Sequence, residues 1–293
     1  MKRNLFGYVL LIGGIQLLFG TIARAAEKKA QQAESSRLAA VEQELGGRLG
    51  VAILDTGDGK RLEYHATDRF PMCSTFKFLA VAAVLHKVDT HQEDLEHRIS
   101  YSPADLDTWA PVTKEHVKEG SMTLDGLCGA AIEYSDNTAA NLLLQSIGGP
   151  NGFTQYIRSL GDPITRLDRT EPTLSTALAG DERDTTTPNS MLQDTQLLLL
   201  GDKLSQASRQ QLEAWLAGNK LGDKRLRAGL PADWRVGDKT GTGENGARGD
   251  VAIVRPPNRP PILMVVYTHG SGVSDEKLND AFAAVGRVVA DGF

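Results

Sequence analysis

The order of strand and helix patterns along the chain constrains the fold more than any other feature of the sequence. Strand patterns occur near both ends, at residues 49–54, 61–65, 235–240, 250–254 and 262–267. Helical patterns fill the middle, at residues 76–88, 124–132, 138–147, 190–200 and 205–217, and two more occupy the ends, at 26–45 and 275–290. A single antiparallel sheet built from both ends, with the helical middle inserted, satisfies this order. We therefore expect an α+β fold of the α/β sandwich type, with terminal helices flanking the sheet.

This arrangement predicts two subdomains. Residues 26–68 and 219–293 would form the α/β subdomain, and residues 69–218 an all-helical one. Chemistry is expected at the junction between them. Within the helical part, residues 166–188 show no period and many turn-forming residues, and a loop of that length is often functional.

The first 25 residues read as a signal peptide. Lys2 and Arg3 give a basic start, an apolar run follows, and Ala23-Arg24-Ala25 offers a cleavage site, which predicts export to the periplasm. The alternative is a retained membrane anchor, weakened by Gln16 and four glycines. Cleavage would leave 268 of 293 residues, with no stable membrane anchor. The loss of three basic residues and no acidic one takes the net charge from −5 to −8, which argues against a nucleic-acid partner.

The histidines and cysteines argue against a metal site. The six histidines form no H-x-H or H-E-x-x-H spacing, so we expect no metal. The two cysteines, Cys73 and Cys128, could pair in an exported protein, but two buried free thiols fit this small number better. Residues 241–246 match the G-x-G-x-x-G dinucleotide fingerprint, yet a strand pattern follows them where a helix is required. We expect a hairpin there and no cofactor.

Ser74-Thr75-Phe76-Lys77 is the first motif with chemical potential. Its serine and lysine lie on one face at the start of an apolar helix, where an unprotonated amine could accept the serine proton. Burial lowers the pKa of a lysine in the direction that this role requires. The same spacing recurs at Ser274 and Lys277 in a polar context, where the serine is expected to cap a helix.

Two further motifs each allow two interpretations. Ser135-Asp136-Asn137 lies at a break between two helices and could be a helix cap or part of a site. Lys239-Thr240-Gly241 ends an apolar strand and could bind a carboxylate, or could be a solvated lysine beside a turn.

Together the three motifs resemble those of the class A serine β-lactamases, with roughly 60 and 100 residues between them. The likeness extends over the mature chain and includes residues 135–144, 147–149, 184–188 and the Glu171-Pro172 pair. It implies that residues 166–188 are the omega loop of that family. It also implies an ion pair between Arg169 and Asp184 at the neck of the loop, and a cis Glu171-Pro172 bond.

The resemblance implies five catalytic residues, namely Ser74, Lys77, Ser135, Glu171 and Lys239. The first would attack the lactam carbonyl, and its backbone N–H and that of Thr242 would form the oxyanion hole. Lys77 and Glu171 are both candidate bases for acylation. Ser135 would pass a proton to the lactam nitrogen with help from Lys239.

The resemblance also implies a set of substrate-binding residues, namely Trp109, Asn137, Ser175, Thr240, Thr242 and Arg248. The tryptophan would form a wall of the cleft, and Asn137 would bind the amide of the substrate side chain. The two threonines and Arg248 would bind the substrate carboxylate.

The implied activity is hydrolysis of the β-lactam amide bond of penicillins, and of some cephalosporins, through an acyl-serine intermediate, by a monomeric enzyme that confers antibiotic resistance. The alternatives are a penicillin-binding D,D-peptidase and a β-lactam sensor that stays acylated. Glu171 separates these activities, because a carboxylate that activates water against the acyl ester permits turnover.

Three positions depart from the family pattern. Ser175 stands where the family usually has an asparagine, and a hydroxyl offers one donor where an amide offers two. Deacylation could therefore be slower, or its water differently placed. Cys128 and Cys73 match halves of disulfides known in some members, but the partner positions hold Val81 and Gly243. Two free thiols are again expected.

Overall fold

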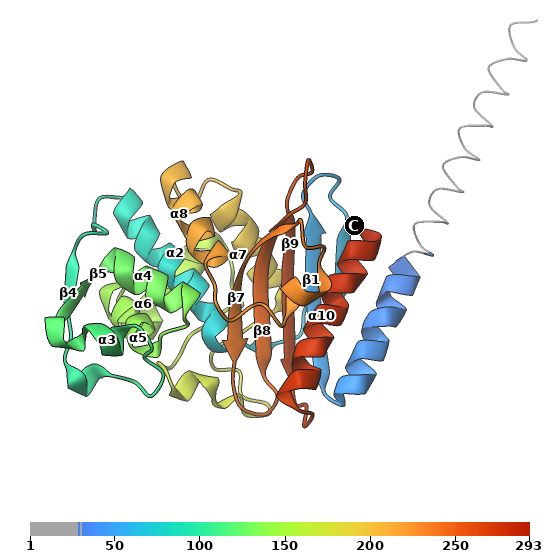
Figure 1. Cartoon of the computed structure of the whole chain (residues 1–293), viewed down its shortest axis with the longest axis horizontal. Helices are drawn as coiled ribbons and strands as arrows, with labels where there is room; N and C mark the ends of the chain where they lie inside the picture. Colours follow the sequence, from blue (N-terminus) through green and yellow to red (C-terminus); the bar gives the residue numbers. More distant parts are fainter. Residues whose placement is uncertain (1–28, 30) are drawn as a thin grey trace, which may run out of the picture.

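The computed structural model describes residues 29 and 31–293 (Figure 1). The predicted signal peptide lies outside these residues. Across the described part of the chain, no helix is both long and apolar enough to cross a bilayer.

A five-stranded antiparallel sheet joins the two ends of the chain, as the sequence predicted. Its order is β2-β1-β9-β8-β7. The strands are β1 Arg48–Asp55, β2 Arg61–Tyr64, β7 Arg235–Thr242, β8 Arg248–Arg255 and β9 Ile262–His269. All eight residues of β1 pair with β9, from Arg48 opposite His269 to Asp55 opposite Ile262. The α+β fold is therefore confirmed, and β7 becomes an edge strand beside the helical part (Figure 1).

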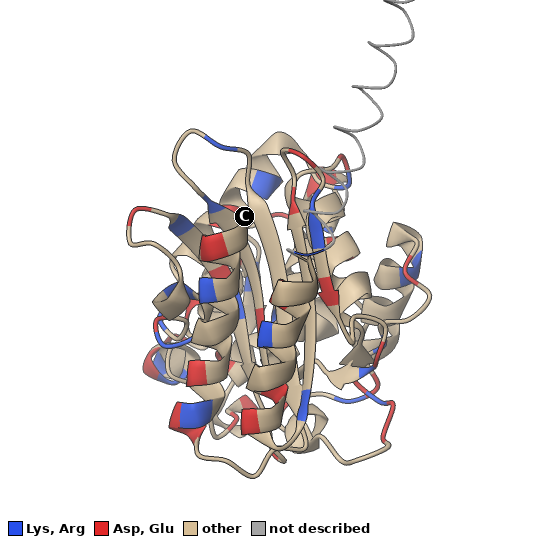
Figure 2. Cartoon of the chain, turned by 90° about the vertical axis from the view of Figure 1, so that its right-hand side faces the viewer, with Lys and Arg blue, Asp and Glu red and all other residues tan. Residues whose placement is uncertain are grey.

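Two helices from opposite ends of the chain cover one face of the sheet. They are the N-terminal helix, described over residues 31–45, and α10, Asp275–Gly292 (Figure 1). Their apolar sides share a core with β1, β8 and β9, in which Leu38, Ile53, Val266 and Phe282 are buried. Charged residues of both signs lie along these helices on the side facing the viewer in Figure 2. The short helix α9, Leu226–Gly229, packs against α10.

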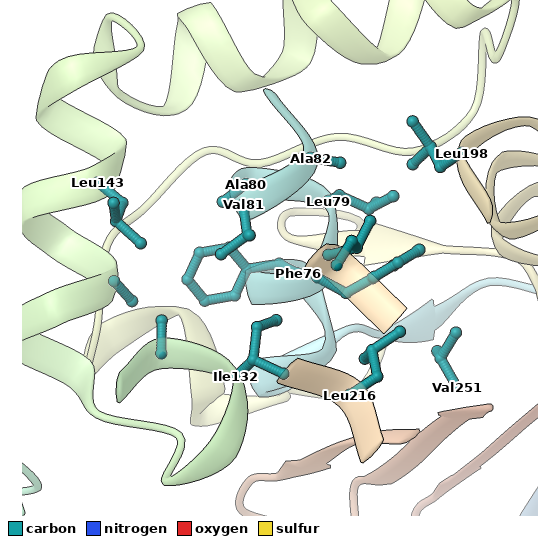
Figure 3. Packing of buried hydrophobic residues seen from close by; sticks show 14 of the residues in the cluster. Phe76, Leu79, Ala80, Val81, Ala82, Ile132, Leu143, Leu198, Leu216 and Val251 are labelled. Atoms are coloured by element: carbon teal, nitrogen blue, oxygen red, sulfur yellow. The ribbon is translucent and has the colours of Figure 1, made fainter. Parts of the chain in front are cut away.

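The other face of the sheet packs on the helical part, whose centre is α2, Phe76–Asp89. Its first ten residues are all buried, so α2 has no solvent-facing side over nearly three turns. Figure 3 shows Phe76 and Val81 among side chains from the surrounding helices. These helices are α4 Leu124–Glu133, α5 Asn137–Ser146, α6 Gly149–Leu160, α7 Pro188–Leu199 and α8 Gln206–Ala217. Each fully buried large apolar side chain contributes about 1.5–3 kcal/mol.

Helix α6 was missed by the sequence patterns, which ended the preceding helix in Gly148-Gly149-Pro150. Gly148 does break the chain with a positive φ of 92°, but the proline occupies the first turn of the next helix. Proline is tolerated there because that N–H has no helical partner. The residues Gly148-Gly149-Pro150 therefore end one helix and begin the next.

The remaining elements are short. They are β3 Phe70–Pro71, η1 Cys73–Thr75, β4 Arg98–Ser100, η2 Pro103–Asp105, α3 Thr113–His116, η3 Val117–Glu119, β5 Ser121–Thr123, η4 Thr173–Thr176 and β6 Thr185–Thr186. The pairs β3-β6 and β4-β5 form two small sheets. The larger core runs without interruption from the helices onto the sheet, so the subdomain boundaries at residues 68/69 and 218/219 stay a prediction.

Candidate active site

Ser74 lies in η1, the 3-10 turn that leads directly into α2. The preceding residue, Cys73, has a φ of 45° and is buried, which turns the chain sharply at this point. The Ser74 hydroxyl donates to Oε1 of Glu171 at 3.0 Å, although 97 residues separate the two in sequence. The omega loop therefore brings its glutamate onto the serine at the head of the buried helix.

Lys77 lies one turn after the serine and is completely buried. Its Nζ is 3.0 Å from the same Oε1 atom of Glu171. It also donates to Oδ1 of Asn137 at 2.6 Å and to the backbone oxygen of Ser135 at 2.8 Å. The Lys77 amine and the Ser74 hydroxyl thus share one carboxylate oxygen, an arrangement in which protons can move between the three groups.

Lys239 approaches the site from the edge strand β7. Its Nζ donates to Oγ of Ser135 at 3.0 Å and to the backbone oxygen of Thr240 at 2.7 Å. Complete burial, and then the charge of Lys77, lower the pKa of Lys239 well below its ordinary value. Lys77 reaches the same Ser135 hydroxyl from the other side, at 3.4 Å. The hydroxyl of Ser135 therefore sits between two buried amines.

The Ser135-Asp136-Asn137 motif contains a helix cap and also places two side chains in the cleft. Asp136 caps α5 by accepting from the backbone N–H of Ala139 at 2.9 Å, and it also accepts from the backbone and side chain of Thr113. Ser135, with a φ of 56°, and Asn137 face the site. The buried aspartate fixes the break between the helices, and the break positions its two neighbours.

The omega loop is held at its neck by the predicted ion pair. Arg169 donates to Asp184 at 2.6 Å, and the aspartate is fully buried. The Glu171-Pro172 bond is cis, as predicted. A contact that the sequence did not indicate involves Asn141, whose amide accepts from the backbone N–H of Glu171 and donates to its carbonyl, each at 3.0 Å. Asn141 therefore fixes the backbone of the glutamate from α5.

Comparison with known proteins agrees with this geometry. The profile of the beta-lactamase enzyme family matches residues 33–293. Beta-lactamase CTX-M-8 of Citrobacter amalonaticus is 44% identical over 279 residues, covering 95% of this chain and 94% of the relative. Beta-lactamase OXY-2 of Klebsiella oxytoca is 42% identical, covering 97% and 96%.

Among solved structures, an ancestral class A β-lactamase (GNCA) has a TM-score of 0.87 and 56% identity, covering 89% of this chain and 100% of that one. The last common ancestor of Gram-negative bacteria (GNCA4) class A β-lactamase also has a TM-score of 0.87, with 58% identity over 88% of this chain and 98% of that one. This chain belongs to the class A serine β-lactamases. Its activity is β-lactam hydrolysis.

The active-site cleft of this β-lactamase has a volume of about 660 Å³. It is lined by Ser74, Trp109, Ser135, Asn137, Glu171, Pro172, Ser175, Lys220, Leu221, Asp223, Lys224, Arg225, Thr240, Thr242 and Asn279. Eight of the eleven residues predicted for the site are in this set. The other two predicted catalytic groups, Lys77 and Lys239, lie buried behind it. Trp109 is half exposed at the rim, and its indole N–H donates to the backbone oxygen of Tyr134 at 3.1 Å.

Arg248 does not line this cleft. Its guanidinium donates to the backbone oxygens of Gly243 and Ala247, and it forms an ion pair with Asp275 at 2.5 Å. The sequence did not single out Arg225, which does line the cleft and whose Nη2 donates to Oγ1 of Thr242 at 2.7 Å. Arg225 is buried and is held by the backbone oxygens of Gly241 and Gly249, at 2.8 and 2.7 Å. No motif marks it; only the fold brings it beside β7.

The three departures from the family pattern have clear structural counterparts. Ser175 donates to Oε2 of Glu171 at 3.3 Å. Cys73 and Cys128 are both free and buried, as predicted, and burial raises the pKa of the Cys73 thiol to about 12. A side chain at Gly243 would place its Cβ 2.6 Å from Sγ of Cys73, so glycine is required for the close approach of the β7–β8 turn.

The second S-x-x-K match and the G-x-G-x-x-G match both have structural explanations. Ser274 caps α10 by accepting from the backbone N–H of Lys277, so the second S-x-x-K match is structural. Residues 241–246 cover the last two residues of β7 and most of the turn into β8, with no helix after them. Across the described residues, no cluster of three or more His, Cys, Asp or Glu side chains is arranged to hold a metal ion.

Proposed function

We propose that this β-lactamase hydrolyses penicillins, and some cephalosporins, through an acyl intermediate on Ser74. The observation that carries the proposal is the shared oxygen of Glu171, which lies 3.0 Å from both the Ser74 hydroxyl and the Lys77 amine. When the hydroxyl oxygen bonds to the lactam carbonyl carbon, its proton passes to this pair. Glu171 contacts the hydroxyl directly, and Lys77 contacts the same carboxylate oxygen, so both stay candidate bases.

Opening of the ring breaks the C–N bond, and the lactam nitrogen then needs a proton. The hydroxyl of Ser135 can supply it, and this hydroxyl contacts Lys239 at 3.0 Å and Lys77 at 3.4 Å. The lowered pKa of Lys239 makes its protonated form a stronger acid toward that hydroxyl. The negative charge on the carbonyl oxygen would be stabilised by the backbone N–H groups of Ser74 and Thr242.

Deacylation requires water to attack the ester carbon and to release the Ser74 oxygen. Glu171 is the proposed base, with its two carboxylate oxygens facing different hydroxyls: Oε1 faces Ser74 and Oε2 faces Ser175 at 3.3 Å. A water between Ser74 and Ser175 would reach both the ester and the carboxylate. In this proposal Ser175 takes the place of the family's asparagine in orienting the water.

For substrate binding we propose Trp109 as a wall of the cleft, Asn137 as partner of the side-chain amide, and Thr240 and Thr242 as partners of the carboxylate. We add Arg225 as the cationic partner of the substrate carboxylate, because it lines the cleft and donates to the Thr242 hydroxyl. Arg248 remains a candidate only if binding breaks its ion pair with Asp275.

The deciding experiment is steady-state hydrolysis of nitrocefin and benzylpenicillin by the wild-type enzyme and by Glu171→Ala, with mass spectrometry of each. Wild-type turnover together with a stable adduct on Ser74 in the variant is the expected result. If the wild type itself stops after one equivalent, the chain acts as a penicillin-binding protein or sensor, and Ser175 becomes the first residue to replace with asparagine.

We also propose that residues 1–25 direct export to the periplasm, that the mature enzyme is a monomer, and that its activity confers β-lactam resistance. The first part is supported by the basic, apolar and small-residue order of that segment. N-terminal sequencing of enzyme recovered from the periplasm should begin at residue 26, and light scattering should give the mass of one chain.

A further inference from the structure

Three consecutive carbonyls of the omega loop, those of residues 175–177, accept hydrogen bonds from the sheet. The backbone N–H of Glu244 donates to the Ser175 oxygen at 3.0 Å. The side-chain amide of Asn245 donates to the Thr176 and Ala177 oxygens, at 3.1 and 3.2 Å. Nε2 of His269 lies 2.9 Å from the Ala177 oxygen. The donors come from the β7–β8 turn and from the end of β9, which are far from the loop in sequence.

His269 must be the donor in its contact, because a carbonyl oxygen only accepts. This fixes the hydrogen on Nε2. The residue is buried at the last position of β9, where it pairs with Arg48 of β1. The next N–H, that of Gly270, donates to the backbone oxygen of Asn245 at 2.7 Å. The two side-chain donors therefore belong to one rigid unit built on the sheet.

The accepting residue, Ala177, connects this unit to the nucleophile. It ends η4 with a φ of 47°, a conformation that residues other than glycine keep only where the surroundings hold it. Its side chain is buried in a small cluster with Cys73 and Ala247. Cys73 immediately precedes Ser74. The contact of Ala177 with Cys73 therefore packs the omega loop against the start of α2.

We propose that His269 and Asn245 form a second anchor of the omega loop and are positioning residues for deacylation. The first anchor, the Arg169–Asp184 pair, closes the neck of the loop, and Asn141 holds the backbone of Glu171. Arg169 also donates to the Thr176 hydroxyl at 2.9 Å, but none of these contacts holds the backbone carbonyls of residues 175–177. Ser175 lies in η4, whose end is held by the second anchor. This inference rests on the proposed role of Glu171 and Ser175 in placing the hydrolytic water.

The separation of the two anchors predicts a selective effect. Loss of the second anchor should move Ser175 while Asn141 keeps Glu171 near Ser74, so acylation should survive and deacylation should slow. A displacement of a positioning group by about 1 Å can cost on the order of 100-fold in rate. The Ser175 hydroxyl has only one donor, so a shifted Ser175 has no second group with which to hold the hydrolytic water.

The test compares His269→Leu, which removes the donor, with His269→Gln, whose amide can still donate to the Ala177 oxygen. Asn245→Asp is a second, independent variant, since it replaces the donor with an acceptor of the same shape and is tolerated at positive φ. Single-turnover acylation and deacylation of benzylpenicillin are measured separately. Hydrogen exchange of residues 173–177 and of α2 reports whether the loop alone loosens.

We expect deacylation to slow about tenfold or more in His269→Leu and Asn245→Asp, with acylation within about threefold of wild type, a range typical of a misplaced positioning group. Acyl-Ser74 should accumulate, exchange should rise at residues 173–177 only, and His269→Gln should recover most of the rate. Equal losses in both steps, or unchanged kinetics in both variants, would overturn the anchor.

A failure of the proposed function looks different. In that case the wild type forms an adduct and never releases it, whatever stands at residue 269. The anchor is then judged by exchange alone, and it fails if residues 173–177 exchange at the same rate in wild type and His269→Leu.

Discussion

At the scale of single residues, the site places two arginines near Thr242 and gives them different partners. Arg225 is buried, donates to the Thr242 hydroxyl and lines the cleft. Arg248 is also buried, but its guanidinium forms an ion pair with Asp275 and does not line the cleft. The family resemblance pointed to Arg248, whereas the geometry favours Arg225 as the cation nearest to a bound carboxylate.

We therefore expect Arg225→Gln to lower kcat/KM for benzylpenicillin about 10- to 100-fold, mostly through KM, since a charged hydrogen bond contributes about 1.5–3 kcal/mol. Arg248→Gln should change it much less. The methyl ester of benzylpenicillin, which lacks the carboxylate charge, is the matched control, and both variants should handle it like the wild type. A larger loss in Arg248→Gln than in Arg225→Gln would show that Arg248 swings into the cleft on binding.

At the scale of elements, the omega loop depends on contacts between distant residues, because its only regular pieces are η4 and the two residues of β6. The Arg169–Asp184 pair has a fully buried acid, whereas both side chains of the neighbouring Arg166–Asp168 pair are partly exposed. Removing one partner of a buried pair leaves an uncompensated charge, which costs far more than loss of an exposed pair.

Arg169→Ala should accordingly lower the free energy of unfolding by about 3 kcal/mol, the low end for a buried pair, because Asp184 also accepts from two backbone N–H groups. Arg166→Ala is the control and should cost less than about 1 kcal/mol. Urea titration followed by circular dichroism measures both. Similar losses in the two variants would mean that Asp184 does not depend on its arginine.

At the scale of the whole molecule, one buried acid links stability to pH. Asp194 in α7 has its pKa raised to about 9, first by burial and then by the charge of Asp162. An exposed aspartate ionises near pH 4. Between these two values the folded chain holds a proton that the unfolded chain has released, so the free energy of unfolding falls as the pH rises through this window.

Asp194→Asn should remove this dependence, because the amide has nearly the same shape and does not ionise. We expect the variant to gain stability relative to wild type as the pH rises from 5 to 8, by at most about 1.4 kcal/mol per pH unit. Urea titrations at several pH values measure the difference, and the contributions of all other groups cancel in it. A difference that stays constant over this range would show that Asp194 is already ionised in the folded enzyme.

The sequence by itself determined the sheet, the helices that carry motifs and most of the proposed catalytic group. Strand patterns at both ends left few ways to bury their apolar faces, and Ser74, Ser135 and Lys239 lie in motifs whose spacing is specific as a set. The departures at Ser175 and Gly243 were also visible, because they are single positions in a recognised pattern. Helix α6 was missed because the glycines and proline at its N-terminus also fit the end of the preceding helix.

Only the tertiary structure decided what depends on contacts between distant segments. Asn141, Arg225 and His269 belong to no motif, and each acts through a hydrogen bond to a residue 17 or more positions away. Local patterns report which face of an element is buried, but they carry no information on which polar group of another element it will meet. That pairing is fixed when the sheet edge, α5 and the omega loop pack together and each buried donor has to find its acceptor.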